Sequence, residues 1–181
     1  MHCPSASEKV DTTIVYAQTD SPVGPVWVAA TEAGICAVRL GAGQPRGLLA
    51  WLSGRIDSQG EPPREAPEAL APALGQLCEY FFRTRREFDL PLDLRGTPFQ
   101  RTVWEKVTRI PYGTTTTYGE IARCIARPRA ARAVGGANGA NPLPIIIPCH
   151  RVIGARGALT GYGAGLTIKA ELLKLEGALL V

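Results

Sequence analysis

The sequence predicts an α/β fold, with an N-terminal α/β domain in residues 1–92 and a mainly helical domain in residues 96–181. Two observations support this division. The first half opens with short β-branched runs separated by turn residues, and the second half consists of short segments with apolar residues at helical spacing. A chain of 181 residues is long enough for two small domains that share an interface. The Pro-containing stretch 88–98 is the expected linker.

Three strand-like runs begin the N-terminal domain. They are rich in β-branched and apolar residues, and the tetrapeptides SPVG and TEAG lie between them as turn material. This alternation predicts a meander or a pair of hairpins. The runs are TTIVYAQTD (12–20), VGPVWVAAT (23–31) and GICAVRLGA (34–42).

A polar, Pro-rich connection (54–67) follows, and then a segment (68–85) with the periodicity of an amphipathic helix. The residues expected along its apolar side are Leu70, Leu74, Leu77, Cys78 and Phe81.

The C-terminal domain is expected to start with a helix over residues 98–110, which Pro111 and Gly113 end. Its apolar side is formed by Phe99, Val103, Trp104, Val107 and Ile110. In the next segment, Thr117 is followed three residues later by Glu120. This spacing predicts a capping box, which places Tyr118 in the first turn of a second helix.

Pro128 suits the start of a further helix over residues 129–138, after a very short turn. Two short helices joined by a tight turn suggest a helix-turn-helix. The later helix consists almost entirely of Ala and Gly, and a glycine in a helix interior costs roughly 1 kcal/mol relative to alanine. We infer a need for close backbone approach, either tight packing or a groove that admits no bulk. Arg132 is the exception on this helix.

The net charge of +4 is distributed unevenly. Residues 1–95 carry 9 Lys+Arg and 12 Asp+Glu, whereas residues 96–181 carry 11 Lys+Arg and 4 Asp+Glu. The second half therefore has a net charge of +7 against −3 for the first. This asymmetry suggests a domain that faces a polyanion, although a lopsided solvent-exposed surface would look the same.

No apolar run approaches the roughly 20 residues of a membrane span, and the N-terminus lacks the apolar core of a secretory signal. A cytoplasmic protein that does not contact membranes is expected. In that compartment the five cysteines are expected as free thiols. With His2 and His150 as the two histidines, no convincing zinc spacing exists.

The stretch IIIPCHRVI (145–153) places Cys149 beside His150. A nucleophilic cysteine reacts as the thiolate, which a nearby base can generate. Pro148 is expected to end a strand, and the chain must then turn for both side chains to serve one site. The alternative is a buried cysteine beside a surface histidine.

The last predicted helix covers residues 166–177, with Gly177 as its C′ residue. Glu176 lies in the final turn, where a carboxylate meets the unfavourable end of the helix dipole. It is either a solvated surface carboxylate or one that pairs with His150 to complete a Cys–His–Glu relay. Periodicity does not distinguish the two.

Three segments (98–122, 129–153 and 161–177) together resemble the O6-alkylguanine-DNA alkyltransferases, also called methylated-DNA–protein-cysteine methyltransferases. The resemblance is close over residues 96–177 and looser over residues 12–92. It implies a ribonuclease H-like N-terminal α/β domain and a winged helix-turn-helix DNA-binding domain.

By this resemblance Cys149 is the acceptor that takes the alkyl group from the base and keeps it. His150 and Glu176 are the pair that activates it, with the histidine acting through a water molecule. Asn141 braces the turn, and Tyr118 protonates the departing guanine.

The resemblance also implies that Arg132 intercalates through the minor groove and fills the gap left by the extruded nucleotide. Val152, Tyr162 and Gly163 match the base pocket. The remaining residues expected to contact DNA or the base are Ala131, Gly135 and Arg151.

The implied reaction is a stoichiometric transfer from O6-alkylguanine in double-stranded DNA to a monomeric protein, without a cofactor. Some relatives bind zinc in the N-terminal domain. Cys36 occupies one ligand position of that pattern, but Thr31 occupies another, and we predict no metal. The preferred alkyl group and activity on O4-alkylthymine are not decided by the sequence.

Two alternatives come from other classes. A sensor that holds alkylated bases without transfer would lack the acceptor cysteine, which is present here. A Cys–His hydrolase would not be expected to carry its adjacent Cys–His pair within a basic helix-turn-helix.

Overall fold

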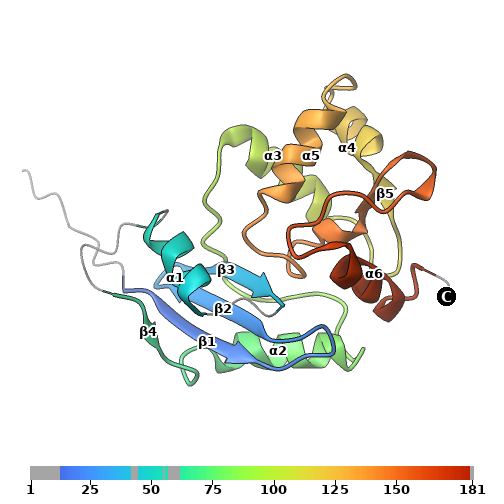
Figure 1. The fold of residues 1–181 in the computed structure, drawn as a ribbon. Coiled ribbons are helices and arrows are strands. Elements are labelled where there is room, and N and C mark those ends of the chain that lie inside the picture. The colour runs from blue at the N-terminus through green and yellow to red at the C-terminus, as the bar shows by residue number, and fades with distance from the viewer. Residues whose placement is uncertain (1–12, 42–44, 55, 57–61, 180–181) are drawn as a thin grey trace, which may run out of the picture.

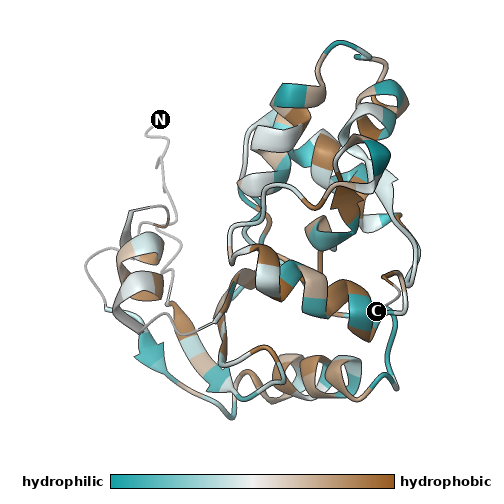
Figure 2. Cartoon of the chain, turned by 45° about the vertical axis from the view of Figure 1, so that its right-hand side comes forward, coloured by the Kyte–Doolittle hydropathy of each residue, from teal (hydrophilic) through white to brown (hydrophobic). Residues whose placement is uncertain are grey.

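The computed structural model describes residues 13–41, 45–54, 56 and 62–179. Its elements form two bodies, which Figures 1 and 2 show from two sides. One contains a four-stranded sheet with helices α1 (Pro45–Ser53) and α2 (Ala71–Phe81). The other contains helices α3 to α6, and α6 lies between α2 and the remaining helices.

The sheet has the order β3-β2-β1-β4. Strands β1 (Val15–Thr19), β2 (Val26–Thr31) and β3 (Gly34–Leu40) pair antiparallel, which confirms the expected hairpins. Every residue of β2 is buried, because the hydrophobic residues on the two faces of the sheet belong to two separate clusters. One cluster includes Leu48 and Leu52 of α1, and the other includes Leu77 and Tyr80 of α2.

Sequence reasoning did not predict α1 or β4 (Arg64–Glu65). The second of these lies within the stretch expected to be only a connection. Its two residues are exposed and carry no apolar signal. It joins the sheet through its backbone alone, parallel to β1, and the amide of Arg64 donates to the carbonyl of Ile14 at 3.0 Å.

Helix α2 forms where expected, but one residue of its predicted apolar side is misplaced. Its buried residues are Ala73, Leu77, Tyr80 and Phe81, whereas Cys78 is exposed. Adjacent helical residues are about 100° apart around the axis. The buried face centres on Leu77 and Tyr80, so Cys78 turns to solvent.

The predicted linker is extended, as expected, and it is fixed to the sheet. The amide of Ile35 donates to the carbonyl of Pro91 at 2.8 Å, and Ile35 accepts from the amide of Asp93 at 2.9 Å. Gly34 permits this approach because it has φ +133°, and a Cβ there would lie 2.3 Å from the carbonyl oxygen of Pro91. The linker therefore forms part of the edge of the sheet.

The helical body consists of α3 (Pro98–Thr108), α4 (Tyr118–Cys124), α5 (Ala131–Gly139) and α6 (Leu166–Leu175). Helix α5 packs against α3 and α4. The predicted capping box between Thr117 and Glu120 is present and starts α4. Strands β5 (Thr116–Thr117) and β6 (Val152–Ile153) form a small parallel sheet beside these helices.

Helix α5 starts later than predicted, because Pro128 lies in the preceding turn. Helix α4 ends in a Schellman motif, in which Ala126 has φ +57° and the amide of Arg127 bonds back to the carbonyl of Ala122 at 2.9 Å. Residues 125–130 therefore form the turn of the helix pair. Among the described helices, none has the length and apolar character needed to cross a membrane.

Candidate active site

The segment before Cys149 is not the strand that the sequence suggested. Ile147 forms a single isolated bridge with Pro144, and Ile145 adopts φ +75°, a strained conformation for a buried β-branched residue. Asn141 fixes this irregular loop, since its Nδ2 donates to the carbonyl of Ile147 at 2.8 Å and its Oδ1 accepts from the amide of Leu143 at 2.9 Å. The brace around Asn141 replaces strand pairing.

The chain then turns, as the site requires. Residues Cys149–Arg151 form one turn of 3₁₀ helix, and the carbonyl of Cys149 accepts a hydrogen bond from Nδ2 of Asn138 at 3.2 Å. Burial raises the pKa of the Cys149 thiol to about 11. The hydrogen bond from Asn141, the charge of Lys169 and hydrogen bonds from nearby backbone amides lower this pKa but do not offset the burial. The resting thiol is protonated at neutral pH, so its use as a nucleophile needs a base.

His150 follows Cys149 in the same 3₁₀ turn and is the candidate base. Its ring is fully buried, and Nε2 lies 2.8 Å from Oε1 of Glu176. Burial lowers the pKa of His150, although the hydrogen bond that its ring donates to Glu176 acts to raise it, so the ring is neutral at pH 7. Because the carboxylate accepts from Nε2–H, Nδ1 carries the lone pair, and Nδ1 has no hydrogen-bond partner among the described residues. The ring can therefore accept a proton at Nδ1.

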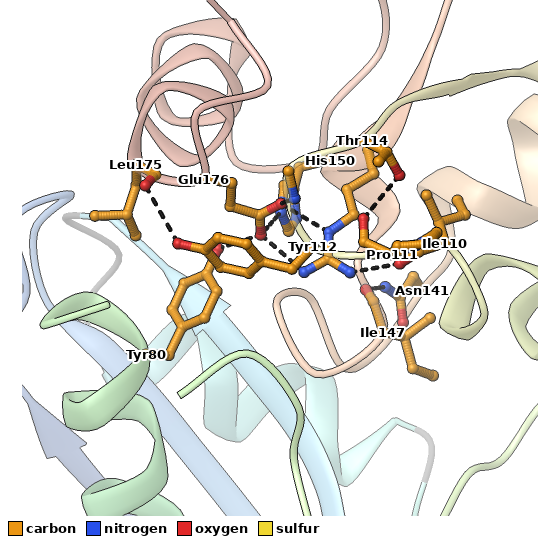
Figure 3. Close-up of polar contacts among 12 residues, drawn as sticks. Tyr80, Ile110, Pro111, Tyr112, Thr114, Asn141, Ile147, His150, Leu175 and Glu176 are labelled. Atoms are coloured by element: carbon orange, nitrogen blue, oxygen red, sulfur yellow. Dashed lines mark hydrogen bonds and ion pairs between the residues drawn. The ribbon is translucent and has the colours of Figure 1, made fainter. Parts of the chain in front are cut away.

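The carboxylate of Glu176 is the centre of a buried network (Figure 3). Its side chain is completely inaccessible and accepts two bonds from the guanidinium of Arg151, at 2.8 and 2.9 Å. The amide of Gly113 and the hydroxyl of Tyr80 also donate to it, at 3.3 and 2.7 Å. Burial alone would raise the pKa of this carboxyl, but the bonds from His150 and Arg151 lower it to about 2. Glu176 is therefore not the solvated carboxylate of the alternative interpretation.

The expectation that Arg151 contacts DNA or the base is wrong. The side chain is buried, and besides its two bonds to Glu176 it donates from Nη1 to the carbonyl of Ile110 at 2.6 Å. A guanidinium used in this way stabilises the network from inside and is not available to a ligand.

Lys169 is a site residue that sequence reasoning missed. It is fully buried on α6, and Nζ donates to the carbonyls of Val152 and Thr160 at 2.6 and 2.8 Å. Its charge lowers the pKa of Cys149. The helical spacing of the sequence could have indicated that Lys169 is buried. Lys169 and Glu176 stand at the two ends of one apolar face, with Leu172 and Leu173 between them.

Cys149 opens onto a pocket of about 220 Å³. Tyr162 and Gly163, the residues predicted for the base pocket, line this pocket, and the hydroxyl of Tyr162 has no hydrogen-bond partner among the described residues. Val152 was expected in the pocket wall, but it is fully buried and does not line the pocket. Sequence reasoning also missed the N-terminal side of the wall, which is formed by Val38, Arg39, Leu40 and Trp51.

Tyr118 stands at the first position of α4, beside the pocket loop. Its hydroxyl donates to the carbonyls of Thr160 and Gly161 at 3.2 and 3.4 Å. Burial raises its pKa, and the charge of Cys149 raises it further. The phenol is therefore a protonated donor near the thiol at neutral pH.

Helix α5 presents a small-residue surface with Arg132 exposed on it. Ala131 is half-buried. A Cβ added at Gly135 would meet the ring of Tyr118 at 3.9 Å, and one added at Gly136 would meet no atom of the described residues within 4 Å. Internal packing therefore does not explain the glycine at position 136.

The four cysteines within the described part of the chain are free thiols, and Cys3 lies outside it. Across residues 13–41, 45–54, 56 and 62–179, no group of three or more His, Cys, Asp or Glu side chains is arranged to hold a metal ion.

Two family models match the chain. Residues 98–178 match the DNA-binding domain of 6-O-methylguanine DNA methyltransferase, and residues 14–94 match its ribonuclease-like domain. The methylated-DNA–protein-cysteine methyltransferase of Mycolicibacterium paratuberculosis is 47% identical over 90% of this chain and 92% of its own length.

The chain belongs to the 6-O-methylguanine DNA methyltransferase family.

Its two-domain architecture, ribonuclease-like and then DNA-binding, is that of the family and confirms the predicted fold class. The methylated-DNA–protein-cysteine methyltransferase of Methanosarcina acetivorans is 46% identical over 90% of this chain and 98% of its own length. A crystal structure of Mycobacterium tuberculosis OGT in complex with DNA aligns with a TM-score of 0.76 at 45% identity, over 90% of this chain and 92% of that one.

Proposed function

We propose that this member of the methyltransferase family repairs duplex DNA by transferring the alkyl group of O6-alkylguanine to Cys149, once per protein molecule. The observation that carries the proposal is the Cys149–His150–Glu176 arrangement at the pocket. A thiol with a pKa of about 11 is followed in the same 3₁₀ turn by a neutral imidazole whose Nε2 is held by a carboxylate at 2.8 Å. This geometry generates a thiolate only when a base removes the proton.

In the proposed reaction, the thiol proton passes to Nδ1 of His150 through a water molecule. Lys169 stabilises the thiolate, which attacks the alkyl carbon. An S–C bond forms as the C–O6 bond breaks, and the electron pair leaves with the guanine. Tyr118 donates its hydroxyl proton to the departing base and is reprotonated from solvent, while His150 releases its proton.

The target carbon lies inside a duplex, so the nucleotide must leave the stack at a cost of a few kcal/mol. The proposal assigns the docking surface to residues 96–181, with α5 in the minor groove and Arg132 filling the gap. The exposed Gly136 and the exposed Arg132 side chain on that helix support this assignment. Residues 1–92 form the second domain, and the protein acts as a monomer on cytoplasmic DNA.

Two features favour transfer over the alternatives. A sensor needs no acceptor, yet the thiol is positioned beside a base. A hydrolase must return the cysteine to its free state, but water at neutral pH displaces a thiolate from an alkyl carbon very slowly, in contrast to attack on an acyl carbonyl.

The test is a time course with duplex DNA carrying isotopically labelled O6-methylguanine. We expect a single burst of at most one equivalent, with the label on the peptide that contains Cys149. The Cys149→Ser variant should bind the same duplex without transfer, and the exposed Cys124→Ser variant should behave as wild type. Continued release beyond one equivalent would indicate a hydrolase, and binding without transfer by the wild type would indicate a sensor.

A further inference from the structure

The carboxylate of Glu176 collects donors from both bodies of the protein. Those from residues 96–181 are His150, the two nitrogens of Arg151 and the amide of Gly113. The remaining donor is the hydroxyl of Tyr80 on α2, which lies 2.7 Å from Oε1. Figure 3 shows Tyr80 reaching up from α2 to the carboxylate. Oε1 is also the oxygen that His150 contacts.

The side chain of Tyr80 is held rigidly. It is completely buried, and its ring packs edge-on against Phe81 and Tyr112, with centroids 5.3 and 6.2 Å apart, and at a tilt against Phe88 at 5.8 Å. An aromatic side chain has two rotatable bonds, and this packing fixes both. The hydroxyl is therefore directed at Oε1 by the N-terminal domain.

We propose that Tyr80 is a positioning residue for the reaction, through which the N-terminal domain sets the orientation and proton affinity of the His150–Glu176 pair. This inference rests on the proposed function. Tyr80 touches neither the thiol nor the pocket, and it acts through the carboxylate.

The physical argument concerns the electron density on Oε1. A hydrogen bond from a phenol withdraws density from this oxygen, so Oε1 attracts the Nε2 proton of His150 less strongly. Without the phenol, Glu176 would stabilise the imidazolium more, and the pKa of His150 would rise. The ring must be neutral to accept the thiol proton, so the acid limb of the rate profile would move to higher pH.

Other charged and titratable groups near His150 also affect its pKa. Arg151 follows it in the 3₁₀ turn and shares its carboxylate, and Lys169 faces it from α6. Both cations lower its pKa, whereas Glu176 raises it. Cys149 precedes it in the chain. Of these groups only Glu176 is hydrogen-bonded to the hydroxyl of Tyr80, so a shift in the acid limb reports on that hydroxyl acting through the carboxylate.

The experiment compares Tyr80→Phe with Tyr112→Phe in single-turnover transfer from O6-methylguanine duplexes across a pH series. The hydroxyl of Tyr112 belongs to the same aromatic cluster but donates to the carbonyl of Leu175 at 3.2 Å, not to Glu176. We expect Tyr80→Phe to move the acid limb up by about half a pH unit, which slows transfer about threefold on that limb and changes the rate little at neutral pH. DNA affinity should be unchanged, and Tyr112→Phe should leave the profile in place.

A second substitution covers the case in which Tyr80→Phe does not fold. Replacing Tyr80 with 3-fluorotyrosine keeps the ring and the hydroxyl but makes the phenol more acidic and its hydrogen bond to Oε1 stronger. The acid limb should then move to lower pH. An unchanged acid limb in either folded variant, or an equal shift in Tyr112→Phe, overturns the inference. Absence of transfer by the wild type would overturn the proposed function instead.

Discussion

Lys169, completely buried on α6, donates a hydrogen bond of 2.6 Å to the carbonyl oxygen of Val152. Its second bond, to the carbonyl of Thr160, also involves a neutral acceptor. Burial lowers the pKa of Lys169 to about 8, while the charge of Cys149 acts to raise it. The ammonium therefore stays mostly charged at neutral pH, near the thiol that becomes an anion in the proposed transfer.

Lys169→Met should slow transfer by about one to two orders of magnitude, because a nearby opposite charge contributes on the order of 1–3 kcal/mol to stabilising the thiolate. The thiol pKa of Cys149 should rise above that of the wild type, which can be followed by the ultraviolet absorbance of the thiolate. Lys174→Met is the control, since that lysine pairs with Glu171 at 3.2 Å, away from the site. A wild-type rate in Lys169→Met would show that its charge is not used.

Gly136→Ala should stabilise the protein while weakening its binding to DNA. A Cβ meets no described atom there, and alanine is favoured over glycine in a helix by roughly 1 kcal/mol. The added methyl group would stand on the surface that we assign to the minor groove. Gly75→Ala on α2 is matched to it, with the same open space, and should raise the melting temperature without affecting DNA binding. Equal DNA affinities in both variants would exclude α5 from the groove.

Arg132→Ala should slow repair in duplex DNA far more than reaction with the free base O6-methylguanine. In duplex DNA the nucleotide must leave the base stack at a cost of a few kcal/mol, and Arg132 is proposed to offset that cost. The free base is not stacked, so its reaction does not need this stabilisation. Arg101→Ala removes the same charge from an exposed position on α3 and should affect both substrates little. The measurement is the ratio of the two single-turnover rates. A ratio that does not change in Arg132→Ala would contradict the gap-filling role.

Acid should unfold the protein partly by protonating Glu176. The pKa of this carboxyl is lowered from 4.5 to about 2 in the folded state, so its contribution is fully present above pH 4.5 and is lost as the pH falls toward 2. The loss is on the order of 3 kcal/mol over that window. Denaturant unfolding of Glu176→Gln should show a shallower fall in the same window. Glu171→Gln, at an exposed position on the same helix, should retain the slope of the wild type.

Local patterns were sufficient for much of this protein. The alternating β-branched runs gave the three antiparallel strands, and Thr117 with Glu120 gave the start of α4, because such signals are satisfied by neighbours in the chain. Adjacency alone identified Cys149 and His150 as candidates. Weak local signals failed: β4 is held by its backbone, and Pro128 lies in a turn that the αL residue Ala126 determines.

Only the tertiary structure decided what surrounds the thiol. Glu176 could have faced solvent. Its partners are Tyr80, Gly113, His150 and Arg151. All four are distant from Glu176 in the sequence, and the sequence does not show toward which side the His150 and Arg151 side chains point. Burying a carboxylate is costly unless several donors converge on it, and that convergence depends on how α2, α6 and the 3₁₀ turn pack together. The same packing turned Arg151 inward to Glu176 and directed Lys169 to the carbonyls of Val152 and Thr160. Sequence periodicity alone does not specify these partners.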